Sequence, residues 1–205
     1  MIGHKSYSRL SMDKNIKFQH FTLTQTERAK IKQQTPMCLW MTGLSGAGKS
    51  TLANALEQEL NKKGKHTYIL DGDNLRHGLN SDLGFSETDR NENVRRAAET
   101  AKLMIDAGLI AIVGLISPFK KERDWARSLF KDNQFKEIFI STSLEACEHR
   151  DTKGLYEKAR RGEVKDFTGI DSLYESPDNP DIIIDTENKT VAECAQFILQ
   201  KANLT

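Results

Sequence analysis

The sequence has few cysteines and no long apolar run, and each scarcity excludes a class of protein. Its three cysteines, Cys38, Cys147 and Cys194, lie far apart and form no C-x-x-C pair, which argues against a disulfide framework or a zinc site and favours reduced thiols. No apolar run approaches the roughly 18 residues that a membrane-spanning helix needs, and residues 1–10 have no secretory signal pattern. We therefore expect a cytoplasmic protein without a membrane partner.

The chain also has no excess of charge of one sign. Its 30 Lys and Arg residues are matched by 29 Asp and Glu residues, which gives a net charge of +1. A protein that binds nucleic acid nonspecifically carries a broad positive field, so we expect no nucleic-acid partner. With 205 residues, 38% of them hydrophobic, the chain is long enough for one domain with a substantial core and is too apolar for a disordered protein.

Short apolar segments alternate with segments of helical periodicity along most of the chain. Helical periodicity is clearest where Leu52, Leu56 and Leu60 recur every four residues. The strands predicted from apolar runs span residues 37–41, 66–70, 110–116, 138–140 and 182–184. Five strands that alternate with helices predict an α/β class fold, a doubly wound, mostly parallel five-stranded sheet with helices on both faces. Ligand sites in such folds lie at the carboxyl ends of the strands.

Two polar segments stand apart from this alternation. Residues 1–35 are polar and mixed in charge, which predicts an N-terminal arm, so the domain itself would span residues 36–205. Residues 151–180 are rich in charge, glycine and proline and are long for a connection inside a compact domain. We expect this second segment to be a mobile lid.

Residues 43–50 match the phosphate-binding pattern G-x-x-x-x-G-K-[ST] at every specified position, after a predicted strand and before a predicted helix. Glycines let successive backbone N–H groups converge on phosphate oxygens, and the helix N-terminus adds partial positive charge. Lys49 would reach the β- and γ-phosphates of a nucleotide, and the Ser50 hydroxyl would bind Mg²⁺. The pattern predicts a nucleotide-binding loop over residues 43–51.

Two carboxylates, Asp71 and Asp73, follow the second predicted strand. One carboxylate at this place can accept a proton from an attacking hydroxyl while a second orders Mg²⁺. We assign Asp73 as the base and Asp71 as the metal-side residue. The alternative, in which the two residues only cap the next helix, stays open.

Cationic and amide side chains gather after this point. Arg90 and Asn93, about one helical turn apart, are placed to contact the same anionic acceptor, because Arg binds phosphate and sulfate in bidentate fashion. For Arg95 and Arg96, a place on the solvated surface fits as well as a contact with this acceptor. Ser117, at the end of the most apolar strand, is either a substrate contact or a phosphate acceptor.

Taken together, these motifs resemble those of the adenylylsulfate kinase (APS kinase) family of P-loop kinases. The resemblance covers most of the chain from about residue 15, and no other P-loop kinase family is known to us to combine the motifs. They lie at residues 42–51, 71–76, 82–86, 90–93, 116–119, 150–156 and 167–171.

The resemblance implies a P-loop fold and a defined reaction. That reaction transfers the γ-phosphoryl group of ATP, with Mg²⁺, to the 3′-hydroxyl of adenosine 5′-phosphosulfate (APS), which yields ADP and 3′-phosphoadenosine 5′-phosphosulfate (PAPS) for sulfate assimilation. The resemblance also implies a homodimer. It adds Arg150 to the nucleotide-binding residues Gly43, Leu44, Ser45, Gly46, Ala47, Gly48, Lys49, Ser50 and Thr51. The implied acceptor site comprises Asp71, Asp73, Arg76, Phe85, Arg90, Asn93, Ile116, Ser117, Lys153 and Phe167, with the two phenylalanines stacked on adenine.

The catalytic set is then Asp73, Lys49 and Ser117, and the metal-side residues are Ser50 and Asp71. In the family the serine at the position of Ser117 is often described as a phosphoserine intermediate. The chemistry does not require one, because positioning and charge neutralisation suffice for direct transfer.

The sequence departs from the family pattern at three places: Ala47, residues 141–143 and Thr152. None of these departures removes a group with an assigned chemical role, so they affect local geometry only. A switch GTPase would explain the D-x-x-G matches at 151–154 and 166–169, but neither match closes a predicted strand. A nonenzymatic nucleotide-binding regulator leaves the paired aspartates unexplained. The nearer alternative is another small-molecule or nucleotide P-loop kinase.

Overall fold

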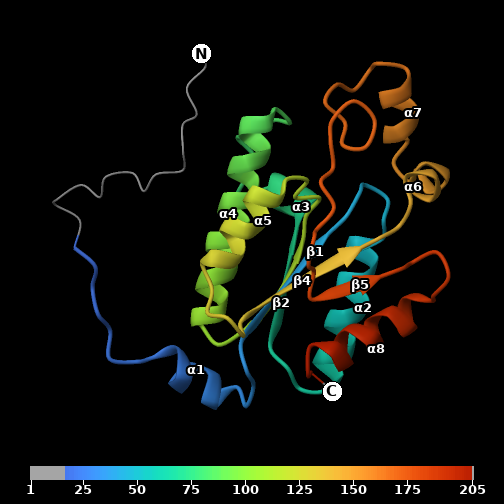
Figure 1. Ribbon diagram of the computed structural model, residues 1–205. Helices are drawn as coiled ribbons and strands as arrows, with labels where there is room; N and C mark the ends of the chain where they lie inside the picture. The colour runs from blue at the N-terminus through green and yellow to red at the C-terminus, as the bar shows by residue number, and fades with distance from the viewer. Residues whose placement is uncertain (1–16, 205) are drawn as a thin grey trace.

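The computed structural model describes residues 17–204, in which a five-stranded sheet lies between two layers of helices (Figure 1). The strand order is β2-β3-β1-β4-β5, and every neighbouring pair is parallel. The predicted doubly wound α/β fold is therefore confirmed, with an all-parallel sheet. The strands are β1 (Met37–Thr42), β2 (Thr67–Asp71), β3 (Ile110–Gly114), β4 (Phe135–Ile140) and β5 (Ile182–Ile184).

The helices divide between the two faces of the sheet. Helices α2 and α8 pack on one face, and α4 and α5 pack on the other (Figure 1). The helices are α1 (Gln25–Ile31), α2 (Lys49–Lys62), α3 (Gly72–Arg76), α4 (Glu87–Asp106), α5 (Lys120–Ser128), α6 (Leu144–Arg150), α7 (Leu155–Arg160) and α8 (Val191–Lys201). None of the helices in residues 17–204 is long and apolar enough to cross a membrane.

The position of β1 in the sheet explains why its sequence is continuously apolar. Leu39 and Met41 pack into the core beneath α2 and α8, whereas Cys38 and Trp40 pack beneath α4 and α5. All four side chains are 0% exposed, because a parallel strand between two helical layers buries both of its faces.

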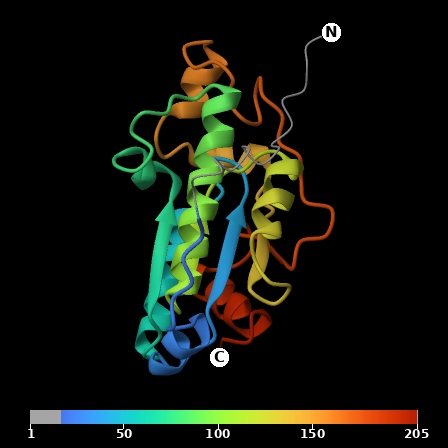
Figure 2. The ribbon, with the colours of Figure 1, turned by 90° about the vertical axis from the view of Figure 1, so that its left-hand side faces the viewer.

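Part of the predicted N-terminal arm forms a capped helix. Thr24 and Glu27 make a capping box at the start of α1. Gln25 Nε2 donates to the Ile105 carbonyl over 3.0 Å, and Arg28 pairs with Asp106 over 2.6 Å, so α1 is fixed to the end of α4. Figure 2 shows α1 at the end of the sheet opposite to α7. The expected arm over residues 1–16 lies outside the described residues.

The predicted lid, residues 151–180, is organised mainly by side-chain caps. Its one helix is α7, which begins where the Asp151 carboxylate accepts hydrogen bonds from the backbone N–H groups of residues 155–157. Asp171 accepts in the same way from the N–H groups of Asp166 and Phe167. Both carboxylates satisfy backbone donors that no strand or helix would satisfy. The mobility of the lid stays a prediction.

Candidate functional site

The loop between β1 and α2 has the shape of a phosphate cradle. Gly46 and Gly48 adopt positive φ angles of 74° and 102°, which L side chains rarely adopt, so glycine is needed at both positions. Gly48 is the N-cap of α2 and provides no capping side chain. The first N–H groups of α2 therefore remain available to an anion, as a phosphate-binding loop requires.

Lys49, the first residue of α2, turns its side chain back over this loop. Its Nζ donates to the carbonyl of Gly43 over 2.8 Å and to that of Leu44 over 2.7 Å. The residue is 9% exposed, and burial lowers the pKa of its ammonium group to about 8. The amine is thus held inside the loop, where a bound phosphate chain would lie.

Ser50 and Asp71 are in contact although they come from separate parts of the sheet. Ser50 lies in α2, which follows β1, and Asp71 ends β2, while β3 lies between β1 and β2. The Ser50 hydroxyl donates to Oδ2 of Asp71 over 2.7 Å. The other oxygen, Oδ1, accepts from the N–H groups of Asp73 and Asn74 and so caps α3. Asp71 therefore both caps the helix and faces the loop. Ser50 and Asp71 offer two oxygen atoms side by side, which fits Mg²⁺ when waters and phosphate oxygens supply its other ligands.

Asp73 and Lys153, two residues of the predicted acceptor site, form an ion pair. Asp73 lies in the first turn of α3, and Lys153 lies just before α7. Both side chains are more than half exposed. The pair links the predicted base to the lid.

Arg76 and Phe85 also come together. The guanidinium of Arg76 lies over the ring of Phe85, 4.5 Å from its centroid, and Nη1 donates to the carbonyls of Leu83 and Gly84. The Phe85 ring is 65% exposed. An exposed ring held by a cation is a suitable surface for a planar base.

Arg90 connects α4 to the lid. Its Nε donates to the Phe85 carbonyl over 2.8 Å, and Nη1 donates to Oγ1 of Thr168 over 2.7 Å. Nη2 donates to the carbonyl of Asp166. Phe85 and the segment that contains Phe167 are therefore joined through one guanidinium.

Three predicted acceptor residues are more buried than direct substrate contacts usually are. Asn93 is 7% exposed, Ser117 is 2% exposed and Phe167 is 8% exposed. The Phe167 ring packs edge-on against Tyr156 at a centroid distance of 4.9 Å, so in this arrangement it faces the core. The stacking of Phe167 on adenine stays a prediction.

Ser117 is held from several sides at a backbone φ of 39°. Its Oγ accepts from Nε1 of Trp40 over 3.2 Å, and its carbonyl accepts from Nη1 of Arg123 over 2.7 Å. The neighbouring Ile116 carbonyl accepts from Oγ1 of Thr42 over 2.7 Å. The geometry of residues 116–117 is thus set by buried hydrogen bonds.

Arg150 lies against the phosphate-binding loop, where its Nη1 is 3.4 Å from the carbonyl oxygens of Gly46 and Ala47. Its Nη2 donates to the carbonyl of Thr186 over 2.9 Å, and its Nη1 donates to Oγ1 of the same residue over 3.0 Å. Thr186 and Thr142 each donate a hydroxyl to the Ala47 carbonyl over 3.1 Å. Neither threonine was among the residues predicted for the site. They follow β5 and β4, so the rule that ligand sites lie at strand carboxyl ends would have found them.

Arg95 and Arg96 both form ion pairs with neighbouring carboxylates. Arg95 pairs with Glu92, and Arg96 pairs with Glu92 and Asp82. These contacts lie within α4 and between α4 and the preceding turn.

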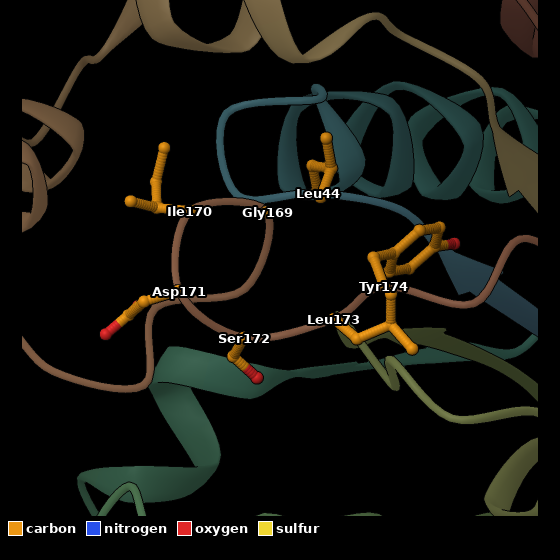
Figure 3. A pocket seen from close by; sticks show the side chains of 7 residues that line it. All are labelled: Leu44, Gly169, Ile170, Asp171, Ser172, Leu173 and Tyr174. Carbon is orange, nitrogen blue, oxygen red and sulfur yellow. The ribbon is translucent and has the colours of Figure 1, made fainter.

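A pocket lies beside the loop rather than over the catalytic candidates. Figure 3 shows it between Leu44 and the lid segment. Its volume is about 500 Å³. Gly169 approaches the loop so closely that a Cβ there would lie 3.1 Å from Cδ2 of Leu44. Of the predicted site residues only Leu44 lines this pocket. The lining comprises Leu44, Gly169, Ile170, Asp171, Ser172, Leu173 and Tyr174.

Comparison with known proteins points to one family. The family model described as adenylylsulphate kinase matches residues 35–185. The chain is 54% identical over 192 residues to the adenylyl-sulfate kinase of Vibrio vulnificus, covering 94% of this chain and 93% of that protein.

Solved structures agree with the family match. A structure of the Mycobacterium tuberculosis APS kinase in complex with AMPPNP and APS is 47% identical and superposes with a TM-score of 0.79, covering 82% of this chain and 98% of that one. A hexameric APS kinase from Thiobacillus denitrificans is 32% identical with a TM-score of 0.63, covering 87% of this chain and 30% of that one.

Proposed function

The chain belongs to the adenylylsulfate kinase family of P-loop kinases, and on this premise we propose that it phosphorylates APS at its 3′-hydroxyl with ATP, giving PAPS and ADP. Members of this family are ATP-dependent phosphotransferases. One observation carries the proposal. The Ser50–Asp71 contact at the phosphate-binding loop lies next to Asp73, in the helix that also holds Arg76 over Phe85. Phosphate binding, a base and a stacking surface are thus joined through α3.

The nucleotide side of the reaction falls to the loop and its neighbours. Backbone N–H groups of residues 43–51 bind the phosphates of ATP, and Lys49 exchanges its loop carbonyls for the β- and γ-phosphates. Arg150 contacts the same loop at the carbonyls of Gly46 and Ala47. Ser50 and Asp71 hold Mg²⁺, which neutralises charge on the phosphates when it is bound.

The acceptor side combines cations, an aromatic ring and a base. Arg76, Arg90 and Lys153 bind the phosphosulfate group of APS, because its charge matches theirs. Phe85 stacks on the adenine. Asp73 then takes the proton of the 3′-hydroxyl as the γ-phosphoryl group moves to that oxygen.

Ser117 positions the acceptor in this proposal and is not phosphorylated. Its Oγ is buried and occupied by the Trp40 indole N–H, which supports a positioning role. The 3′-hydroxyl receives the phosphoryl group directly, since holding both substrates in line supplies much of the required rate.

Three further proposals concern the protein as a whole. The segment of residues 151–180 closes over the substrates as a lid, and its Lys153 and Thr168 contacts to Asp73 and Arg90 mark where it closes. The protein forms a homodimer, which light scattering on the purified chain tests. It works in the cytoplasm, where its three buried free cysteines stay reduced, and cell fractionation tests that location.

The deciding experiment incubates the purified protein with ATP, Mg²⁺ and APS, follows ADP release with a coupled assay and identifies the product by mass. We expect ADP release that depends on APS and a product with one added phosphoryl group on the 3′-oxygen. ATP binding without reaction would reject APS as the substrate and favour another hydroxyl acceptor, to be sought among nucleoside monophosphates and sugar acids. Hydrolysis of GTP with no response to APS would instead indicate a switch protein.

A further inference from the structure

Asn80 is a buried polar residue for which none of the motifs provides a role. It lies in the turn between α3 and α4 and is 0% exposed. Its Nδ2 donates a 2.9 Å hydrogen bond to Oδ1 of Asn93, whereas its own Oδ1 has no partner among the described residues. A buried amide that is half satisfied destabilises a fold relative to an apolar side chain of similar size. The bond to Asn93 is the one polar contact of the Asn80 side chain among the described residues, so stability alone does not explain an asparagine here.

The backbone around Asn80 holds this amide in place. The Asn80 N–H donates to the Leu75 carbonyl over 2.8 Å, and the Leu83 N–H donates to the Asn80 carbonyl over 3.1 Å. From the other side, Nη1 of Arg96 on α4 donates to the Leu79 carbonyl over 3.0 Å. The turn is thus fixed to both α3 and α4, so the Asn80 amide has a set direction.

The hydrogen bond from Asn80 determines which end of the Asn93 amide is left to bind a ligand. An Asn side chain has one accepting end and one donating end. Because Asn80 Nδ2 occupies Oδ1 of Asn93, the end left over is Nδ2, and it forms no hydrogen bond with the described residues. Asn93 lies one turn after Arg90 on α4. A donor there attracts an oxygen-rich anion, whereas a carbonyl oxygen would repel it.

We propose that Asn80 is a positioning residue for the acceptor substrate: it donates to Oδ1 of Asn93 and thereby turns the Asn93 amide nitrogen toward APS. The inference rests on the proposed function and on the place of Asn93 in the acceptor site that the family resemblance implies. Asn80 itself does not touch the substrate. Without this hydrogen bond, the Asn93 amide could turn either its oxygen or its nitrogen toward the substrate. With it, only the nitrogen faces the substrate.

The substitution Asn80→Asp tests this role at nearly constant size. Its carboxylate accepts where the amide donated, which favours a flipped Asn93 with Oδ1 toward APS. We expect the KM for APS to rise on the order of 10-fold, the usual effect of losing one hydrogen bond to a charged group, with kcat and the KM for ATP changed less than about two-fold. Asn80→Ala frees Asn93 to take both orientations and should raise the KM for APS only about two-fold. It also serves if the Asp variant does not fold.

The decisive readout combines Asn80→Asp with Asn93→Ala. If Asn80 acts only through Asn93, then Asn80→Asp raises the KM for APS in the wild-type background and has no further effect when residue 93 is alanine. Equal increases in both backgrounds, or none in the wild-type background, overturn the inference. Asn61→Asp, an exposed change at the end of α2, is the matched control. A wild-type protein that does not phosphorylate APS would overturn the proposed function as well, so the two failures are distinguishable.

Discussion

The hydroxyl of Ser50 donates a 2.7 Å hydrogen bond to Oδ2 of Asp71, across 21 residues of sequence. This bond joins the start of α2, which follows β1, to the end of β2, although β3 lies between β1 and β2 in the sheet. The carboxylate that completes the bond also caps α3, which contains Asp73 and Arg76. One aspartate therefore aligns the phosphate-binding loop with the acceptor side of the site.

Asp71→Asn separates these two roles. Asn is as good an N-cap as Asp, so we expect thermal stability near that of the wild type. The loss of one negative charge beside Ser50 should lower kcat on the order of 10²-fold and raise the Mg²⁺ concentration needed for half-maximal rate. Activity measured against Mg²⁺ concentration checks this. Asp106→Asn, which removes a charge at the far end of α4, should leave both quantities unchanged. An unchanged Mg²⁺ requirement in Asp71→Asn would reject the metal-side role.

The Lys153–Asp73 ion pair predicts different effects for its two partners. Lys153→Met should raise the KM for APS several-fold, because a cation that faces the anionic acceptor is lost, while kcat falls less. Asp73→Asn should lower kcat on the order of 10²-fold or more, because the base is lost. Steady-state kinetics of both variants, with Lys158→Met on α7 as the control, check the assignment. Near-normal kcat in Asp73→Asn at neutral pH would move the base to Asp71 or to water.

Ser117→Ala should remain active within about 10-fold of the wild type, since the Trp40 indole loses its acceptor but no bond-making atom is removed. Wild-type protein incubated with ATP should show no added phosphoryl group at Ser117 by peptide mass. Loss of all activity in the alanine variant, together with a phosphorylated Ser117 peptide in the wild type, would establish a covalent intermediate.

Arg90→Lys keeps the charge but loses the fork that reaches Phe85, Asp166 and Thr168 at once. We expect the KM for APS to rise on the order of 10-fold, by the loss of bidentate contacts to an anion. Trypsin should also cleave faster after Lys165, because the lid loses its tie to α4. Arg95→Lys, whose side chain forms its ion pair with Glu92 on the same helix, is the matched control. Unchanged cleavage and an unchanged KM would place Arg90 outside the site.

Glu122 makes stability depend on pH. Its side chain is buried between α4 and α5, its Oε2 has no partner among residues 17–204, and burial raises its pKa from 4.5 to about 7. The folded state then binds more protons than the unfolded state between these pH values, so the protein loses stability as pH rises from 4.5 through 7. Relative to the wild type, Glu122→Gln should gain up to about 3 kcal/mol over that range and level off above it.

Urea unfolding of both proteins at pH 5, 6, 7 and 8 measures this difference. Only its change with pH is compared, because the amide alters local hydrogen bonding at every pH. Glu145→Gln, an exposed change on α6, should show a difference that is flat with pH. A flat difference for Glu122→Gln would mean that the carboxyl group titrates normally.

Local patterns in the sequence were sufficient for the architecture. Residues 37–41 are apolar without interruption because β1 is covered on both faces, and this signal survives in a single sequence. The α1 helix was missed because its one buried residue, Ala29, gives too weak a periodicity. Its capping box, Thr24 with Glu27, was the available signal.

The site was predictable where a motif fixes backbone geometry and less so where side chains from different segments meet. Gly48, Lys49 and Ser50 lie where the phosphate-binding pattern requires. By contrast, the donation from Trp40 to Ser117 and the bond from Asn80 to Asn93 depend on how distant segments pack, which spacing along the chain does not encode. The burial of Phe167 belongs to the same class.

The three acceptors of Arg90 have a thermodynamic consequence. Its guanidinium donates three of its five N–H groups to Phe85, Asp166 and Thr168, which leaves one N–H on each terminal nitrogen for an anion. The three bonds fix the direction of the guanidinium before any anion arrives, so little side-chain entropy is lost on binding. Selectivity among anions then depends on how well the oxygens of each one match this fixed direction, as well as on charge.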